Sequence, residues 1–344
     1  MSQAPPISCS TGPFYMFSLE ETFELLAEAG FDGVELMITQ DRVSQDPLRM
    51  AAVARRYGMP VPAIHGPFLL ATWFVYGTDP KGKIERCVEY AETARVPTVV
   101  IHPPYRWQVA YAAWLVERIE RVREETGVTI AVENMFPVWL NGRRLQFHNG
   151  IEPQEIGQYP FVALDLSHAA VAGVDILDAY ATLGEQVVHT HVSNNAGRGR
   201  DTHAALDQGV LPVPEFLEEL TASGFGGGIT LELDVRPWAD DRPALIEFLR
   251  ENLATARQHL KLAPNGYVRA GWHLDPQGRL IARSRTTCAD AVASCERSVA
   301  REPKSAVGRT GLEASWRRRC VSALPSCWPP CWWSSWLLPA SSWC

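Results

Sequence analysis

The sequence predicts an α/β protein built as a (β/α)8 barrel over residues 1–264, followed by a tail of different composition over residues 265–344. Strand-like apolar segments alternate with helical segments, which is typical of a parallel sheet, and eight such units fit one closed barrel. Side chains of the metal-ligand type follow six of the strand-like segments. The turn after the first strand, CSTGPFYMFS, holds one glycine and lacks the phosphate-binding turn typical of an open sheet.

The expected strands are short runs rich in Val, Ile and Leu, as buried parallel strands usually are. The first two lie near residues 7–10 and at GVELM (33–37). The other six lie within segments that each carry a His, Asp or Glu at or near the end of the apolar run: AIHG (63–66), TVVIHP (98–103), TIAVEN (129–134), FVALDLSH (161–168), VVHTHVSN (187–194) and GITLEL (228–233).

The expected helices carry recognisable start and stop signals. Ser18, followed three residues later by Glu21, forms a capping box, and Gly30 ends that helix. Asp46 and the proline after it open the next helix. The helical segments cover residues 18–30, 46–58, about 81–95, about 108–126, about 175–183, 212–224 and 242–262.

Nine carboxylates and imidazoles follow the strand ends: His65, His102, Glu133, Asp165, His168, His191, Asp201, His203 and Glu232. Residues at the carboxyl ends of different barrel strands converge on one site even when they are far apart in sequence. Histidine and carboxylate together suit Zn²⁺, Mn²⁺, Co²⁺ or Fe²⁺. The sequence therefore predicts a metal site.

The set Glu133, Asp165, His191 and Glu232 comes from strand ends five to eight. One histidine and three carboxylates are hard enough for Mn²⁺ or Mg²⁺ and still suit Co²⁺ or Zn²⁺. His65 and His102, at the ends of the third and fourth strands, would add two nitrogen ligands and so favour zinc. Whether the site holds one ion or several is left open.

Other polar residues receive a different interpretation. Glu35, also at a strand end, is interpreted as either a substrate contact or a salt-bridge partner, and the second is favoured. His189 is expected to be a core histidine one layer below His191. The histidines at 148, 259 and 273 are not expected at the site. The long segment 136–150 is predicted to shape a substrate pocket, with Trp139, Arg143, Arg144 and Phe147 as wall candidates, although an ordinary lid or surface loop is an equal alternative.

Charge, hydrophobicity and cysteine content limit the expected binding partners and the expected location of the protein. The net charge is −7, and residues 1–264 hold 21 Lys and Arg against 34 Asp and Glu, which disfavours a long phosphate-backbone footprint. We find no apolar run of about 18 residues, as a membrane span requires. The N-terminus lacks the features of a secretory signal, and two scattered cysteines in the body fit a reducing compartment, so a cytoplasmic location is expected.

The tail has another character. Seven of the twelve tryptophans and six of the eight cysteines lie in residues 265–344, while the alternating strand and helix pattern stops. We interpret this tail as an out-of-frame or otherwise non-native extension, with a disordered tail as the alternative. No function is assigned to it.

The chain resembles the xylose-isomerase-like TIM-barrel superfamily over about residues 7–262. The matching pieces are EAGFDGVEL (28–36), AIHGPF (63–68), VVIHPP (99–104), VEN (132–134), LDLSH (164–168), HVSN (191–194), RDTHAALDQGVLP (200–212) and GFGGGITLELD (224–234). The superfamily includes sugar isomerases, ketose 3-epimerases and endonuclease IV-type nucleases that cut DNA at abasic sites.

The resemblance implies site roles. In the sugar branch one divalent metal would be held by Glu133, Asp165, His191 and Glu232, both glutamates would transfer the proton, and His168 would contact substrate oxygens. In the endonuclease IV branch all nine positions hold three zinc ions. The N-terminal stretch SCSTGPFYMFSLEETFELLAEAGFDGVEL looks like the opening of the sugar branch, and the acidic body also favours it.

We therefore expect a metal-dependent sugar or sugar phosphate isomerase or epimerase that carries one Mn, Co, Mg or Zn ion. Its catalytic residues would be Glu133, Glu232 and His168, with Trp139 and Arg143 beside His168 as substrate contacts. A zinc phosphodiesterase acting on abasic DNA with up to three zinc ions is the first alternative, and a non-catalytic metal-bearing binding barrel is the second. The expected partner is a small sugar or polyol, nucleic acid is less favoured, and homo-oligomerisation is left open.

Overall fold

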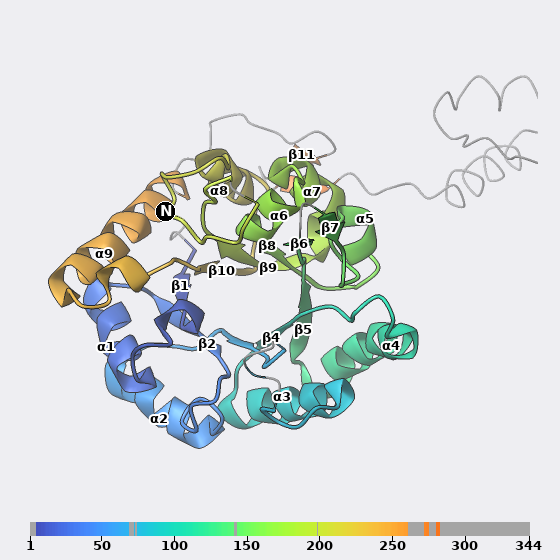
Figure 1. The fold of residues 1–344 in the computed structure, drawn as a ribbon, viewed down its shortest axis with the longest axis horizontal. Coiled ribbons are helices and arrows are strands. Elements are labelled where there is room, and N and C mark those ends of the chain that lie inside the picture. Colours follow the sequence, from blue (N-terminus) through green and yellow to red (C-terminus); the bar gives the residue numbers. More distant parts are fainter. Residues whose placement is uncertain are drawn as a thin grey trace, which may run out of the picture. The chain divides into compact units, whose positions relative to one another are not determined.

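A computed structural model of the protein describes residues 5–68, 72, 74–140, 143–197 and 199–260, and the backbone of 272–274 and 280–282. Eight parallel strands close into a barrel ringed by helices, which confirms the predicted fold (Figure 1). In barrel order the strands are β1 (Ile7–Ser10), β10 (Gly228–Leu231), β9 (Val187–Val192), β8 (Val162–Asp165), β5 (Thr129–Glu133), β4 (Thr98–Ile101), β3 (Ala63–His65) and β2 (Gly33–Met37).

The seven predicted helical segments are all helical in the structure, and two short helices, Pro153–Ile156 and Leu166–Ala172, were not predicted. The Ser18 hydroxyl accepts a hydrogen bond from the Glu21 backbone N–H while the Glu21 carboxylate accepts one from the backbone N–H of Ser18, and Gly30 ends the helix with φ of +92°. The helices are α1 (Leu19–Ala29), α2 (Pro47–Tyr57), α3 (Pro80–Ala94), α4 (Val109–Thr126), α5 (Pro153–Ile156), α6 (Leu166–Ala172), α7 (Ile176–Leu183), α8 (Val213–Ala222) and α9 (Arg242–His259).

The main hydrophobic core lies between the strands and the helices. Phe23, Leu26, Ile119, Leu217 and Leu249 come from helices and are fully buried there. Burial of this apolar surface is the main favourable term for the fold, at about 25 cal/mol per Å².

The inside of the barrel has a small core of its own, formed by Val100, Ala131 and Ala163. Because side chains alternate along a strand, the residues two positions after these alanines also point inward. Those residues are Glu133 and Asp165, at the carboxyl ends of β5 and β8. Small side chains in the lower layer leave room for a charged layer above them.

Two segments differ from the prediction. The strand-like run FVALDLSH is β-structure only to Asp165, because the Asp165 carboxylate accepts a hydrogen bond from the His168 backbone N–H and so caps helix α6. His168 therefore lies in the first turn of a helix. The segment predicted as a loop contains an antiparallel pair, β6 (Val138–Leu140) and β7 (Arg143–Leu145). The Asn-Gly pair between VWL and RRL is a hairpin signal that predicts this pairing.

Beyond residue 260 the description is limited to two short strands, β11 (Trp272–Leu274) and β12 (Leu280–Ala282), which pair antiparallel. The interpretation of the tail as a non-native or disordered extension concerns residues that lie otherwise outside the described ranges, and so does the side chain of His273. None of the helices that the structure describes is long and apolar enough to cross a bilayer.

Candidate metal centre

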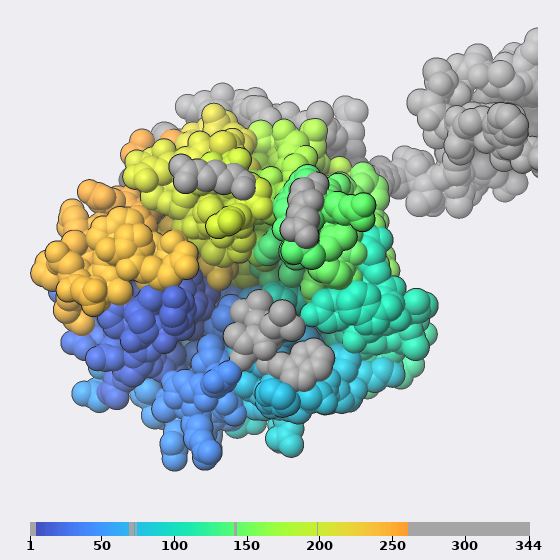
Figure 2. Space-filling model, in the orientation of Figure 1, coloured from blue at the N-terminus to red at the C-terminus, as the bar shows by residue number. Residues whose placement is uncertain are grey.

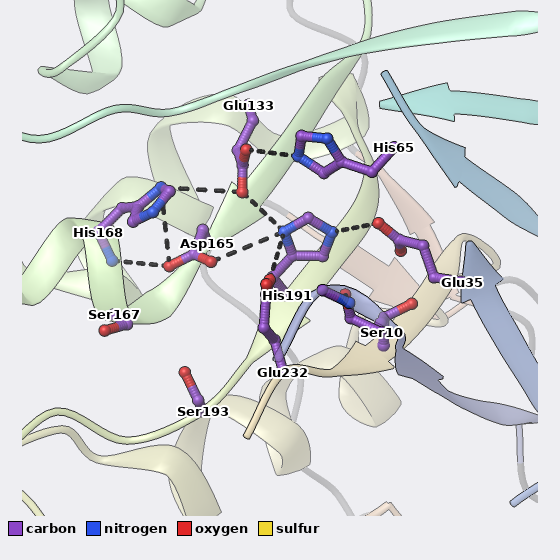
Figure 3. Close-up of polar contacts among 12 residues, drawn as sticks. Ser10, Glu35, His65, Glu133, Asp165, Ser167, His168, His191, Ser193 and Glu232 are labelled. Atoms are coloured by element: carbon purple, nitrogen blue, oxygen red, sulfur yellow. Dashed lines mark hydrogen bonds and ion pairs between the residues drawn. The ribbon is translucent and has the colours of Figure 1, made fainter. Parts of the chain in front are cut away.

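Four of the predicted ligands meet at the carboxyl end of the barrel. In Glu133, Asp165, His191 and Glu232, one ligand atom of each residue lies within 4.8 Å of the others, and all four side chains are buried. The Nδ1 atom of His191 lies 2.7 Å from Glu133 Oε1, 3.6 Å from Asp165 Oδ2 and 3.4 Å from Glu232 Oε2. Figure 3 shows the three carboxylates grouped at this edge of the His191 ring.

Strand register brings these four residues together. Asp165 is the direct partner of His191 between β8 and β9. Glu232 follows β10, and its backbone N–H donates to the carbonyl of Val192, the residue after His191. Glu133 ends β5, which pairs with β8 on the other side. The site is thus a consequence of parallel pairing, which brings the carboxyl ends of these strands to the same end of the barrel.

His65 and His102 form a second group around Glu133. The Nε2 atoms of both rings lie 3.1 Å from Glu133 Oε2, the oxygen that faces away from the four-residue centre. The three residues have ligand atoms within 4.8 Å of one another and are buried. Glu133 therefore links two groups of ligands through its two oxygens.

The last three predicted ligands lie farther out. Asp201 Oδ2 lies 2.8 Å from His203 Nε2 and 3.5 Å from His168 Nε2, and Ser167 donates its hydroxyl to the other Asp201 oxygen at 2.5 Å. His168 Nδ1 donates to the Asn134 carbonyl at 2.8 Å. Within the described part of the chain, the ligand atoms of the four-residue centre and of the group His65, His102 and Glu133 lie within 4.8 Å of one another, but those of His168, Asp201 and His203 do not form such a group.

The four-residue centre fits a divalent cation. Asp165 Oδ2 is buried and has no hydrogen-bond partner among the described residues, while Asp165 Oδ1 accepts from the His168 backbone. A buried carboxylate oxygen without a partner costs free energy, and a cation would satisfy it. The donors, one imidazole nitrogen and three carboxylates, match Mn²⁺, Mg²⁺, Co²⁺ or Zn²⁺.

The charges at the centre are strongly coupled. Burial alone would raise the pKa of Glu133, but the positive rings of His191 and His168 hold this pKa well below its usual range. Burial raises the pKa of Glu232; the His203 and His191 rings oppose this rise, whereas the Asp165 and Glu133 carboxylates add to it. Burial opposes a charged His191, yet the carboxylates of Glu35 and Glu133 raise its pKa well above the usual range. A concentration of negative charge of this kind requires protons or a metal ion.

A family model described as a xylose isomerase-like TIM barrel matches residues 23–252. The chain belongs to this family. An uncharacterized protein of Mycobacterium tuberculosis is 34% identical over 282 residues, which cover 76% of this chain and 99% of that protein. An uncharacterized protein of Mycobacterium leprae is 34% identical over 276 residues, covering 74% of this chain and 97% of that protein.

Two solved structures share the fold of this chain. A D-tagatose 3-epimerase-like protein has a TM-score of 0.56 and 21% identity, and the match covers 74% of this chain and 98% of that chain. The 3-keto-D-glucoside 4-epimerase of Escherichia coli has a TM-score of 0.56 and 18% identity, with coverage of 74% and 99%.

The rim of this xylose isomerase-like barrel carries the predicted pocket-wall residues. The Trp139 ring in β6 is half exposed and lies 3.8 Å from the point that a Cβ atom on Gly199 would occupy. The hairpin therefore meets the segment after β9, and Figure 2 shows these green and yellow segments on one face. Arg143 is exposed at the start of β7. Contact of Trp139 and Arg143 with substrate remains a prediction.

An aromatic surface lies beside His102, and of its residues only Phe147 was predicted to line a pocket. The His148 ring, expected away from the site, lies 6.4 Å from the His102 ring and 4.3 Å from the Tyr105 ring. Tyr105 in turn stacks on Trp107 at 4.7 Å, and Phe147 meets Trp107 edge-on at 6.3 Å. The backbone bridge between Tyr105 and His148 brings these two loops together, and such a long-range pairing leaves no signal in a single sequence.

Glu35 and His189 form a hydrogen-bonded group on the Nε2 side of His191. Glu35, expected as a salt-bridge partner, is fully buried and accepts from both His189 and His191, which confirms that expectation and the core position of His189. His259 pairs with Glu218 on the outer helices, away from the site as expected.

Proposed function

We propose that the protein is a metal-dependent sugar or sugar phosphate isomerase or epimerase that works by proton transfer next to a carbonyl. The observation that carries this proposal is the placement of two glutamates, Glu133 and Glu232, on one imidazole nitrogen of His191 in a buried centre that fits a cation. The structural neighbours described as sugar epimerases support a carbohydrate substrate.

The residues of the centre would divide the work. A divalent cation held by Glu133, Asp165, His191 and Glu232 would supply Lewis-acid polarisation of a substrate carbonyl. Glu133 or Glu232 would remove the proton from the neighbouring carbon, and the other glutamate would return it on the same face or the opposite one. Glu232 is 8% exposed against 1% for Glu133, so it offers the more open route to substrate.

The surroundings would orient the substrate. His168 donates from Nδ1 to Asn134, and its Nε2 lies 3.5 Å from Asp201 Oδ2, so a substrate oxygen bound by His168 would compete with Asp201 for Nε2. Trp139 and Arg143 at the rim would contact the part of the substrate that lies away from the cation. A small sugar or polyol in a cytoplasmic protein remains our expectation, and homo-oligomerisation remains open.

The test is exchange of solvent deuterium into sugars. Protein purified without chelators is incubated in D2O with ketoses, aldoses and keto-glycosides, and incorporation is followed by NMR. Glu232→Gln should abolish exchange while the fold survives, and Glu117→Gln, the same change on an exposed face of α4, should leave it intact. Exchange that persists in Glu232→Gln would reject the proton-transfer role.

Zinc-dependent phosphodiester hydrolysis on abasic DNA is the second candidate. The observation that favours it is the group of His65, His102 and Glu133, which offers ligands for a second ion beside the first. Two or three zinc ions would support hydroxide attack on a phosphodiester. Cleavage of an abasic duplex by the zinc-loaded protein would establish this activity. Saturable ligand binding with no turnover of either substrate class would instead indicate a non-catalytic barrel.

A further inference from the structure

A buried carboxylate lies directly behind the proposed metal ligand His191. Glu35 lies in the middle of strand β2, and its side chain is fully buried, with 0% exposure. Its Oε1 atom accepts from His191 Nε2 at 2.8 Å, and its Oε2 atom accepts from His189 Nε2 at 2.6 Å. Figure 3 shows Glu35 on the opposite edge of the His191 ring from Glu133, Asp165 and Glu232.

The position of one hydrogen decides whether His191 can bind a cation. A neutral imidazole carries one N–H and one lone pair, and the hydrogen bond at one nitrogen fixes which is which. Without an ion, Nδ1 also donates a hydrogen, to Glu133 Oε1 at 2.7 Å. A cation at the centre would displace that hydrogen, and with Nε2–H still donated to Glu35 the lone pair would be on Nδ1. Nδ1 is the atom that faces the three carboxylates of the centre. Glu35 therefore selects the form of His191 that the centre needs.

His189 in turn holds Glu35 in place. The His189 ring packs closely against two neighbours. Gly228 lies so near that a Cβ atom at this position would stand 2.3 Å from His189 Nδ1. Thr230 Oγ1 lies 3.2 Å from His189 Nε2. A ring fixed in this way keeps one oxygen of Glu35 occupied. The other oxygen is left for His191 alone, at a defined direction.

We propose that Glu35, held by His189, is a positioning residue that fixes the orientation and the tautomer of His191 for cation binding. The proposal rests on the cation centre of the proposed function and not on the sugar reaction. Carboxylates that accept from metal-bound histidines raise ligand basicity, and their loss typically weakens metal affinity about 10- to 100-fold.

Glu35, His189 and His191 could instead bind a cation directly, and this alternative predicts a different hydrogen position on His191. Glu35, His189 and His191 also have ligand atoms within 4.8 Å of one another. A cation bound there would need a lone pair, not a hydrogen, at Nε2 of both rings. The two possibilities differ in the hydrogen that His191 carries when the protein is loaded with metal.

The test combines zinc affinity with NMR of the histidine nitrogens. Zinc affinity of the full chain is measured by competition with a chelator. Glu35→Met keeps the side-chain length and removes both acceptors, so Nε2–H is left without a partner and the neutral ring favours Nδ1–H, donated to Glu133. We expect Glu35→Met to bind zinc about 10- to 100-fold more weakly, Glu35→Gln to fall between, and Glu117→Met on the exposed face of α4 to match the unchanged protein.

Nitrogen-15 spectra supply a readout that a purely structural role would not change. The zinc-loaded protein should show Nε2–H on His191, and metal-free Glu35→Met should show Nδ1–H. Zinc affinity within twofold of the unchanged protein in Glu35→Met, or a zinc-loaded His191 without Nε2–H, overturns the proposal. If Glu35→Met fails to fold, the spectrum of the unchanged protein and the affinity of Glu35→Gln decide. A protein that binds zinc yet exchanges no sugar proton would lose only the proposed reaction, whereas one that binds no divalent ion would lose both proposals.

Discussion

Asn134 and Asp165 exchange two hydrogen bonds across neighbouring strands: the Asp165 backbone N–H donates to Asn134 Oδ1 at 2.6 Å, and Asn134 Nδ2 donates to the Asp165 carbonyl at 3.0 Å. Both residues are buried. The pair fixes the backbone from which the Asp165 carboxylate enters the centre. It therefore links the stability of the barrel to the geometry of the site.

Asn134→Ala should both destabilise the protein and weaken metal binding. The change leaves the buried Asp165 N–H without its partner, which costs about 1–3 kcal/mol, and removes one of the hydrogen bonds that the Asp165 carbonyl accepts. Asn252→Ala is the matched control, since Asn252 is also buried and bonds to Leu206 N and Phe248 O at 2.8 Å, away from the centre. Urea unfolding and zinc competition should show loss of stability in both variants but loss of affinity only in Asn134→Ala. Equal affinities would contradict the link.

The number of bound ions should depend on Asp165 and not on His65 and His102. Elemental mass spectrometry of residues 1–264 purified without chelators should find about one ion per chain, because the four-residue centre has the most complete ligand set. Asp165→Asn should lose this ion while an Asn cap still supports α6. The double variant His65→Ala/His102→Ala should keep it. Close to three zinc ions per chain would favour the hydrolase instead.

The capping box at the start of α1 should contribute measurably to stability. Ser18→Ala removes the acceptor for the Glu21 backbone N–H and should lower the free energy of unfolding by about 1 kcal/mol, whereas Ser18→Gly should lower it by only a few tenths. Guanidinium unfolding of the three proteins gives the comparison. Indistinguishable midpoints for Ser18→Ala and the unchanged protein would show that the box is dispensable.

Glu155 should stabilise the protein in a pH-dependent way. Partial burial opposes ionisation, but hydrogen bonds from Arg106 at 2.6 Å and from two backbone N–H groups lower its pKa below the usual 4.5. A carboxyl with a lower pKa in the folded state stabilises at high pH, and the contribution is lost as the pH falls below 4.5 through the folded pKa. The stability difference between the unchanged protein and Glu155→Gln should thus be present at neutral pH and shrink in acid. A difference independent of pH would disprove this.

Much of the centre could be predicted because its residues follow strand ends, and strand ends are visible as apolar runs. His191 and Asp165 could be placed in one site for this reason alone. The boundary at Asp165 was missed because one side chain both ends β8 and caps α6, so an uninterrupted apolar run conceals a change of structure. The contact of Glu35 with His189 joins residues 154 positions apart through register around the barrel, and no local pattern encodes it.

The capping bond at Asp165 has a consequence for how the centre comes into being. One oxygen of this carboxylate is committed to the first turn of α6, so the other can point in only one direction. A ligand that the helix holds in this way is in position as soon as the chain folds, and an arriving ion finds it already aimed. A mutation that unwinds the start of α6 would then slow metal binding although every ligand residue is still present. The rate of metal binding would therefore measure whether the first turn of α6 is intact.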